Sequence, residues 1–216
     1  MFNMKERVAY KRMVSYWLTT ILLTGSYFLL RGSSWKGSEQ LHTLMEVAAT
    51  LLALMVGVMA LVRFYSKNNN TFLIIGAGFI GTASLDAYHA LVTSSWFNVY
   101  FSEDSSALVF WSWVASRLFL SVLLWLSYIA WKREDRLGQA GIIKEKTIFS
   151  SVILATISSF LFFIFLPLPP GYYPDLIIHR PEELIPALFF IAALAGYLKK
   201  GCWRHNAFEH WLVLAL

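Results

Sequence analysis

Charged residues and cysteine are both scarce in this chain of 216 residues. Only 14% of its residues are charged, whereas a typical soluble protein has roughly 25%. The single cysteine, Cys202, excludes a secreted scaffold held by disulfides. The content of 57% hydrophobic and 17% aromatic residues is more than so short a chain can bury in a water-soluble core. The composition indicates an integral membrane protein with the lipid bilayer as its partner, and no nucleic acid is expected as a partner despite the net charge of +5.

Apolar runs set the expected architecture, because a helix needs about 20 apolar residues to cross a bilayer. They are predicted at residues 14–30, 41–62, 71–92, 106–131, 147–168 and 184–198. No clean signal-peptide cleavage site follows the first run, so we predict an uncleaved helix there. A last run, residues 208–216, is about half a span. We predict an all-α polytopic transmembrane bundle of about seven spans, the last one incomplete, in a single domain over residues 1–216.

Basic residues indicate the orientation of the spans. When loops are assigned alternately to the two sides, one side holds only Arg31, Lys36 and Arg180, and Arg117 is left within a span. The remaining lysines and arginines fall on the other side. Because cytoplasmic loops are enriched in lysine and arginine, we predict a cytoplasmic N-terminus.

The loops expected on the outer side have aromatic and proline-rich segments. Trp96, Phe97 and Tyr100 are typical of aromatic residues at a membrane interface. The segment at residues 167–174 contains too many prolines to continue a helix, so we predict a structured crossover there.

Three glycines in the third apolar run match a nucleotide-binding pattern. Gly76, Gly78 and Gly81 have the GxGxxG spacing, which binds a dinucleotide only at a strand–turn–helix junction. No alternation of strands and helices surrounds them. We therefore predict that they allow close contacts between membrane helices.

Ionisable side chains inside the apolar runs mark the candidate functional site. His42 and Glu46 lie four residues apart in the second run, and Asp86 and His89 lie three apart in the third, so each pair shares a helix face. At the rise of an α-helix, Glu46 and Asp86 lie about 8 Å and 9 Å from the same membrane surface. Because charges at this depth are costly, such residues are functional by default. Arg117 lies deeper, with a side chain long enough to reach either carboxylate.

These side chains predict a ligand site but leave its ligand open. Imidazole and carboxylate groups suit a divalent metal such as zinc or iron, with His42, Glu46, Asp86 and His89 as ligands. A haem b with His42 and His89 as axial ligands and Arg117 near a propionate is a second possibility. A small organic ligand or a quinone is a third, and a purely structural salt-bridge network of Arg117 with Glu46 and Asp86 is a fourth.

Further polar residues complete the predicted ligand pocket. Tyr88 precedes His89, and His179 and Glu183 lie at the outer mouth, just before the sixth run. Together with Arg117, we expect these side chains to contact the ligand. The sequence shows no arrangement of residues typical of catalysis, so catalysis by this domain itself is not expected.

Several short motifs follow one another in a fixed order along residues 10–216. They are Leu41-His42 with Glu46, Phe72-Leu73 with Gly76, Phe79, Leu85-Asp86 and His89, then Trp113 to Arg117, Arg180-Pro181-Glu182, Ile185 to Phe189, and Phe208 with Trp211-Leu212. In order and spacing they resemble the third class of bacterial membrane-associated sensor (MASE) domains. The polar residues His42, Glu46, Asp86, His89 and Arg117 match the polar signature of that family.

The resemblance implies a role in signal transduction across a bacterial cytoplasmic (inner) membrane. Domains of this family precede cytoplasmic histidine kinase, PAS or diguanylate cyclase modules, so the chain is expected to be the sensory input part of such a protein and to form a homodimer. It ends inside the seventh predicted span, and we expect a truncation before an eighth span and an output module. The alternative function is an intramembrane metal-dependent hydrolase, in which Glu46 or Asp86 acts as a base on a zinc-bound water.

Overall fold

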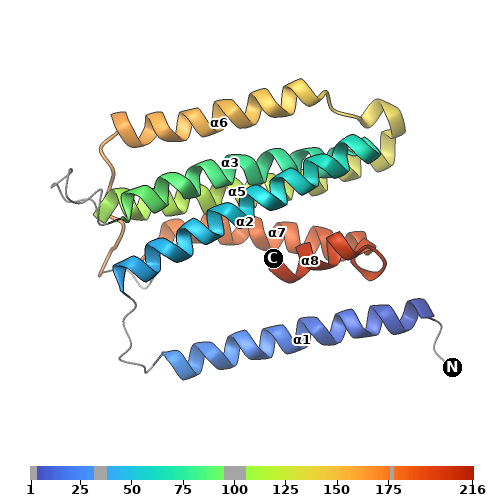
Figure 1. Cartoon of the computed structure of the whole chain (residues 1–216), viewed down its shortest axis with the longest axis horizontal. Helices are drawn as coiled ribbons and strands as arrows, with labels where there is room; N and C mark the ends of the chain where they lie inside the picture. The colour runs from blue at the N-terminus through green and yellow to red at the C-terminus, as the bar shows by residue number, and fades with distance from the viewer. Residues whose placement is uncertain (1–3, 32–37, 95–105, 176–177) are drawn as a thin grey trace. The chain divides into compact units, whose positions relative to one another are not determined.

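The computed structural model describes residues 4–31, 38–94, 106–175 and 178–216. All regular elements in these ranges are helical (Figure 1). The α-helices are α1 (Met4–Leu30), α2 (Glu39–Lys67), α3 (Asn70–Val92), α5 (Ser106–Leu137), α6 (Glu145–Phe165), α7 (Leu184–Lys200) and α8 (Ala207–Ala215). Short 3-10 turns η1 (Gly138–Gly141), η2 (Pro181–Glu183) and η3 (Cys202–Arg204) join some of them. The predicted all-α architecture is confirmed.

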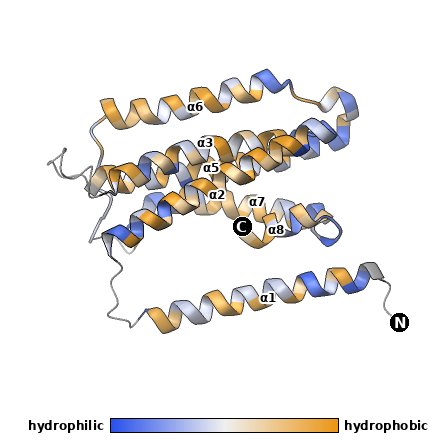
Figure 2. Cartoon of the chain, in the orientation of Figure 1, coloured by the Kyte–Doolittle hydropathy of each residue, from blue (hydrophilic) through white to orange (hydrophobic). Residues whose placement is uncertain are grey.

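Length and hydropathy identify the helices that can cross a membrane. In the part of the chain that the structure describes, six helical segments are long and apolar enough to do so, those containing α1, α2, α3, α5, α6 and α7. Figure 2 shows α1 and α6 as mostly hydrophobic, with hydrophilic residues towards their N-terminal ends. Helix α8 has nine residues, which is too short to span a bilayer. The chain is a multi-pass membrane protein, and the cytoplasmic placement of its N-terminus stays a prediction.

The chain divides into two compact units. The larger unit comprises Gly37–Phe190, and the smaller unit comprises Met1–Lys36 with Ile191–Leu216.

Helix α3 is the central helix of the larger unit and packs against α2, α5 and α6. Of its most apolar stretch, 72% of residues are buried, compared with 17% for α2 and 11% for α6. The surrounding helices expose many large apolar side chains, as expected of surfaces that face lipid. An ionisable side chain on α3 therefore faces protein on almost every side.

A tight turn joins α2 to α3 and makes them antiparallel neighbours. Asn68 ends α2 in a left-handed conformation with φ of 47°, which asparagine tolerates better than most residues. The side chain of Asn69 then accepts a hydrogen bond of 2.8 Å from the Thr71 amide and caps α3. The turn between the two helices thus consists of Asn68, the C-cap of α2, and Asn69, the N-cap of α3. It brings the first turns of α2 beside the last turns of α3.

Gly76, Gly78 and Gly81, which have the GxGxxG spacing, lie where α3 contacts its neighbouring helices. A Cβ on Gly76 would lie 2.7 Å from the Leu61 side chain on α2, and one on Gly81 would lie 2.6 Å from Phe119 on α5. Because no side chain fits there, these glycines allow the close packing that the sequence predicts.

The proline-rich segment after α6 is fixed on the start of α5. The Trp111 indole donates a hydrogen bond of 2.8 Å to the carbonyl oxygen of Pro169. Gly171 lies so close to the Phe110 ring that a Cβ would approach it to 2.4 Å. The predicted structured crossover is confirmed, whereas the predicted interfacial residues Trp96, Phe97 and Tyr100 lie outside the described residues.

In the smaller unit, polar contacts join α1 to the segment around α8. Arg12 donates hydrogen bonds of 2.6 and 3.2 Å to the carbonyl oxygens of Trp203 and Asn206. Lys200 and Glu209 form an ion pair of 2.8 Å, with side chains only 4% and 6% exposed. The nine residues of α8 are thus held by buried polar contacts as well as by apolar packing.

Candidate metal site

Two histidines and a glutamate meet where α2 begins and α3 ends. His42, Glu46 and His89 each offer a ligand atom, and these atoms all lie within 4.8 Å of one another. The two imidazole rings are 6.2 Å apart between centroids and meet edge to face at 87°. His42 and Glu46 lie one turn apart on α2, while His89 comes from the antiparallel neighbour α3. We call these three side chains the His42–Glu46–His89 group.

The members of this group differ in exposure. His42 is exposed, Glu46 is half-buried and His89 is buried, with 3% of its surface exposed. The Oε2 atom of Glu46 is buried and has no hydrogen-bond partner among the described residues. A buried carboxylate oxygen without a partner costs about 1–3 kcal/mol, and more when it is charged. A cation at this position would remove that cost.

A hydrogen bond to α5 orients the ring of His89. Its Nδ1 atom lies 2.8 Å from the Oγ of Ser112, and that hydroxyl donates a 3.0 Å hydrogen bond to the carbonyl oxygen of Val109. Since the hydroxyl proton is committed to Val109, we assign Nδ1–H as the donor to Ser112. The other ring nitrogen, Nε2, then carries a free lone pair. This is how histidines that bind metals are usually supported.

Asp86, predicted as a fourth ligand, lies outside the group. It is buried, with 4% of its surface exposed, and it accepts a hydrogen bond from the Oγ of Ser116 on α5. The structure therefore brings together three of the four predicted ligands. Asp86 lies about one helical turn from His89 on α3.

Arg117 and Tyr88 have partners other than the group. The Arg117 guanidinium lies 5.9 Å from the centre of the Trp113 ring. The ion pairs among the described residues do not include Arg117. The alternative of a salt-bridge network of Arg117 with Glu46 and Asp86 is therefore not observed among these residues. Tyr88 packs against Phe160 and Phe163 of α6, with ring centroids 5.4 and 5.5 Å away.

His179 and Glu183 lie in the segment that precedes α7, as predicted, and neither lines the pocket beside the group. The His179 ring packs on Tyr172 at 5.2 Å, and Glu183 pairs with Arg180 at 3.3 Å. In the same loop, burial and the neighbouring Glu182 carboxylate raise the pKa of Tyr173, so this phenol stays neutral at physiological pH. His179 and Glu183 thus contact other residues of this loop, and the loop itself also packs on α5 through Pro169 and Gly171.

A pocket of about 280 Å³ adjoins the group. Its lining consists of His42, His89, Val109, Phe110, Trp113 and Arg180. From the sequence, Arg180 was an outer basic residue and part of a family motif but had no predicted role in the site, and Phe110 had no predicted role at all. Their position depends on how the loop after α6 folds over α5, and local spacing carries no signal for that.

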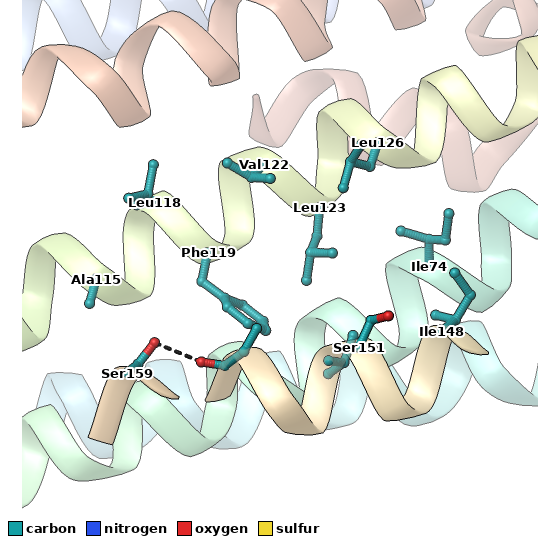
Figure 3. A pocket seen from close by; sticks show the side chains of 12 residues that line it. Ile74, Ala115, Leu118, Phe119, Val122, Leu123, Leu126, Ile148, Ser151 and Ser159 are labelled. Carbon is teal, nitrogen blue, oxygen red and sulfur yellow. Dashed lines mark hydrogen bonds between the residues drawn. The ribbon is translucent and has the colours of Figure 1, made fainter. Parts of the chain in front are cut away.

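A second, larger cavity of about 450 Å³ lies between α5 and α6, with Ile74 of α3 (Figure 3). Apolar side chains such as Leu118 and Val122 line it, and Figure 3 shows Phe119 directed towards α6. Its serine Ser159 is engaged with the Ala155 carbonyl oxygen at 3.0 Å. This cavity is suited to hydrocarbon and offers no metal ligand.

The His42–Glu46–His89 group favours a single metal ion over haem. A tetrahedral zinc ion with bonds of about 2.1 Å has ligand atoms about 3.4 Å apart, so 4.8 Å requires only small rotations of His42 and Glu46. A porphyrin between the two imidazoles would overlap the Glu46 carboxylate, which lies within 4.8 Å of both nitrogens. Two imidazoles and one carboxylate suit zinc or iron.

Comparison with known proteins gives one match. The family model described as a membrane-associated sensor domain matches residues 33–216, which begins after α1 and covers the rest of the chain. No curated protein and no solved structure matches.

Proposed function

This chain belongs to the MASE3 family of membrane-associated sensor domains, and we propose that it senses its signal through a divalent metal ion, zinc or iron, bound by His42, Glu46 and His89. The sensory role follows from the family, and the metal is our inference. In this proposal the domain is the input part of a homodimeric signalling protein of the bacterial inner membrane. Its readout is a cytoplasmic module of the histidine kinase or diguanylate cyclase type.

The observation that carries the proposal is the meeting of three ligand-type side chains within 4.8 Å. Each costs free energy to hold in a membrane helix, about 2.5–3.5 kcal/mol for a charged group at the centre of a span. The unpartnered Oε2 of Glu46 and the free lone pair assigned to Nε2 of His89 are both complementary to a cation. A shared metal ion is the simplest partner for all three.

Metal binding gives a physical route to a signal. The ion would join α2 to α3 through its ligands, and Ser112 would connect the site to α5. A ligand shifts a conformational equilibrium only by its difference in affinity for the two states. The packing of α2, α3 and α5 that brings the three ligands together would be the state that the metal stabilises, and the cytoplasmic module would read the resulting change.

Metal analysis of the purified chain, together with an absorption spectrum, tests the proposal. We expect about one zinc or iron per chain and no Soret band. His42→Ala and His89→Ala should each lower the bound metal by at least about tenfold, because each removes one of three ligands. A Soret band that disappears in both variants would indicate haem instead.

His205→Ala is the matched control, since His205 is an exposed histidine of the smaller unit. It should leave the metal content unchanged. Purified protein with neither stoichiometric metal nor a Soret band would overturn the proposal, as would metal content that His42→Ala and His205→Ala affect equally.

A further inference from the structure

The pocket beside the His42–Glu46–His89 group contains one charged side chain besides the histidines, Arg180. On the premise that the proposed metal site exists, we propose that this pocket binds an anionic oxygen group, a carboxylate or a phosphate, between the metal ion and the Arg180 guanidinium. The anion would then be the chemical signal, and the metal would be the group that receives it.

The ligand count leaves room for such a group. Metal sites with three protein ligands keep a further coordination position for water or an exogenous ligand. The two histidines line the pocket, whereas Glu46 does not. The pocket therefore adjoins the imidazole side of the group, and an exogenous ligand of the metal would enter from there.

The charges favour an anion. A divalent ion with one carboxylate ligand keeps a net positive charge, because the two imidazoles are neutral when they bind metal. Arg180 adds a second positive charge at the same pocket. The guanidinium fork donates paired hydrogen bonds to carboxylate and phosphate oxygens, which makes arginine the preferred residue for such ligands.

Arg180 is held near the pocket by an aromatic ring and by a weak ion pair. Its guanidinium lies 5.4 Å from the centre of the Phe110 ring, which is itself buried under Gly171. Its ion pair with Glu183 is long, at 3.3 Å, and both side chains are accessible, at 53% and 35%. Exposed ion pairs of this kind contribute little, so an anion bound at the metal can replace Glu183.

The volume of about 280 Å³ suits a small anionic group. Val109, Phe110 and Trp113 provide apolar walls, and beside such walls the attraction between opposite charges is stronger than in bulk water. Exchange of Glu183 for the ligand would take place immediately before α7 begins at Leu184. Ligand binding at the metal would thereby act on the start of that helix.

Cobalt(II) in place of the native metal tests the inference, because its visible spectrum responds to a change of coordination. The full chain is loaded with cobalt in a neutral detergent and titrated with sodium acetate and, separately, with sodium phosphate. We expect a saturable spectral change, with an affinity reduced by about tenfold or more in Arg180→Gln. Arg180→Lys keeps the charge without the fork and should be intermediate.

A second arm distinguishes a soluble anion from a lipid headgroup. Cobalt-loaded protein is placed in nanodiscs of phosphatidylcholine or of phosphatidylglycerol, without added salt anion. A spectral difference between the two lipids that Arg180→Gln abolishes supports the inference with a lipid phosphate as the source. A saturable spectral change on addition of acetate or phosphate in detergent supports the inference with a soluble anion as the ligand.

Arg136→Gln, at the polar end of α5, is the matched control and should behave as wild type. The cobalt spectrum of each variant before titration reports whether its site is folded. Cobalt binding with no response to either anion or lipid overturns the inference and leaves the metal site intact, as does a response of equal affinity in Arg180→Gln. Cobalt binding that His42→Ala and His89→Ala do not weaken overturns the proposed function and the inference together.

Discussion

The Nδ1 atom of His89 lies 2.8 Å from the hydroxyl of Ser112, which links the last turns of α3 to the first turns of α5. This contact sets which nitrogen of the ring is available to a ligand. It also connects the candidate metal site to a third helix that supplies none of the three ligand-type side chains. The His89 imidazole therefore lies where α2, α3 and α5 meet: it belongs to α3, bonds to Ser112 of α5 and faces His42 and Glu46 of α2.

Replacement of Ser112 by alanine tests that link. Loss of the acceptor leaves the Nδ1–H group buried without a partner and frees the ring to rotate. We expect the Kd for zinc to rise about 10- to 100-fold, as is usual when a supporting hydrogen bond to a metal-binding histidine is removed. Competition with a chromogenic chelator measures it. Ser121→Ala is the control, because Ser121 is equally buried on α5 and bonds only to the carbonyl oxygen of Leu118 in its own helix. Equal effects of the two substitutions would contradict the role of Ser112.

Asp86→Asn tests whether Asp86 is a direct ligand of the metal or only a carboxylate close to it. Because Asp86 accepts a hydrogen bond from Ser116 and lies outside the group of three, we expect the Kd for zinc to rise by less than about tenfold. His89→Ala should have a much larger effect in the same assay. A loss of zinc as complete as that of His89→Ala would show that Asp86 is a direct ligand, as its sequence spacing suggests.

The sequence predicted the helices well because their lengths follow from the bilayer. The apolar runs correspond to the observed helices, although α2 and α5 extend further, to Lys67 and Leu137, since polar residues continue a helix beyond the apolar core. Helix α6 ends earlier than predicted, at Phe165, just before the prolines that begin at residue 167.

Less of the site was predictable. The i, i+4 spacing placed His42 and Glu46 correctly on one face, since α2 has one protein-facing side. Asp86 and His89 also share a face of α3, as their i, i+3 spacing predicts, because they meet Ser116 and Ser112, which lie one turn apart on α5. Only His89 joins the group on α2, and the spacing gave no sign of that difference. The positions of Ser112 and Arg180 depend on tertiary packing, which periodicity does not encode.

Gly76 provides a test of the helix contact that brings the group together. In Gly76→Ala the new Cβ would lie 2.7 Å from the Leu61 side chain and 3.0 Å from its backbone nitrogen, so α2 and α3 must separate. We expect a loss of about 1–3 kcal/mol in stability, typical of overpacking. Thermal unfolding in detergent, with zinc affinity measured in parallel, should show both quantities reduced. Gly25→Ala, where nothing lies within 4 Å of the new methyl group, should leave both unchanged. A fully stable Gly76→Ala protein would mean that the helices do not pack as described.

The ion pair of Lys200 and Glu209 provides a last test, in the smaller unit. Its side chains are 4% and 6% exposed, so removal of one partner leaves the other charge buried without this counter-ion. Lys200→Met should therefore destabilise the protein by about 3–5 kcal/mol, and Glu209→Gln should have a similar effect. Replacement of both residues at once, by Met and Leu, removes both charges and should restore most of the loss. Chemical unfolding of the two single variants and the double variant in detergent measures the coupling. Additive effects in the double variant would show that the two side chains do not depend on each other, whereas recovery would establish that α8 is held to the end of α7 by this pair.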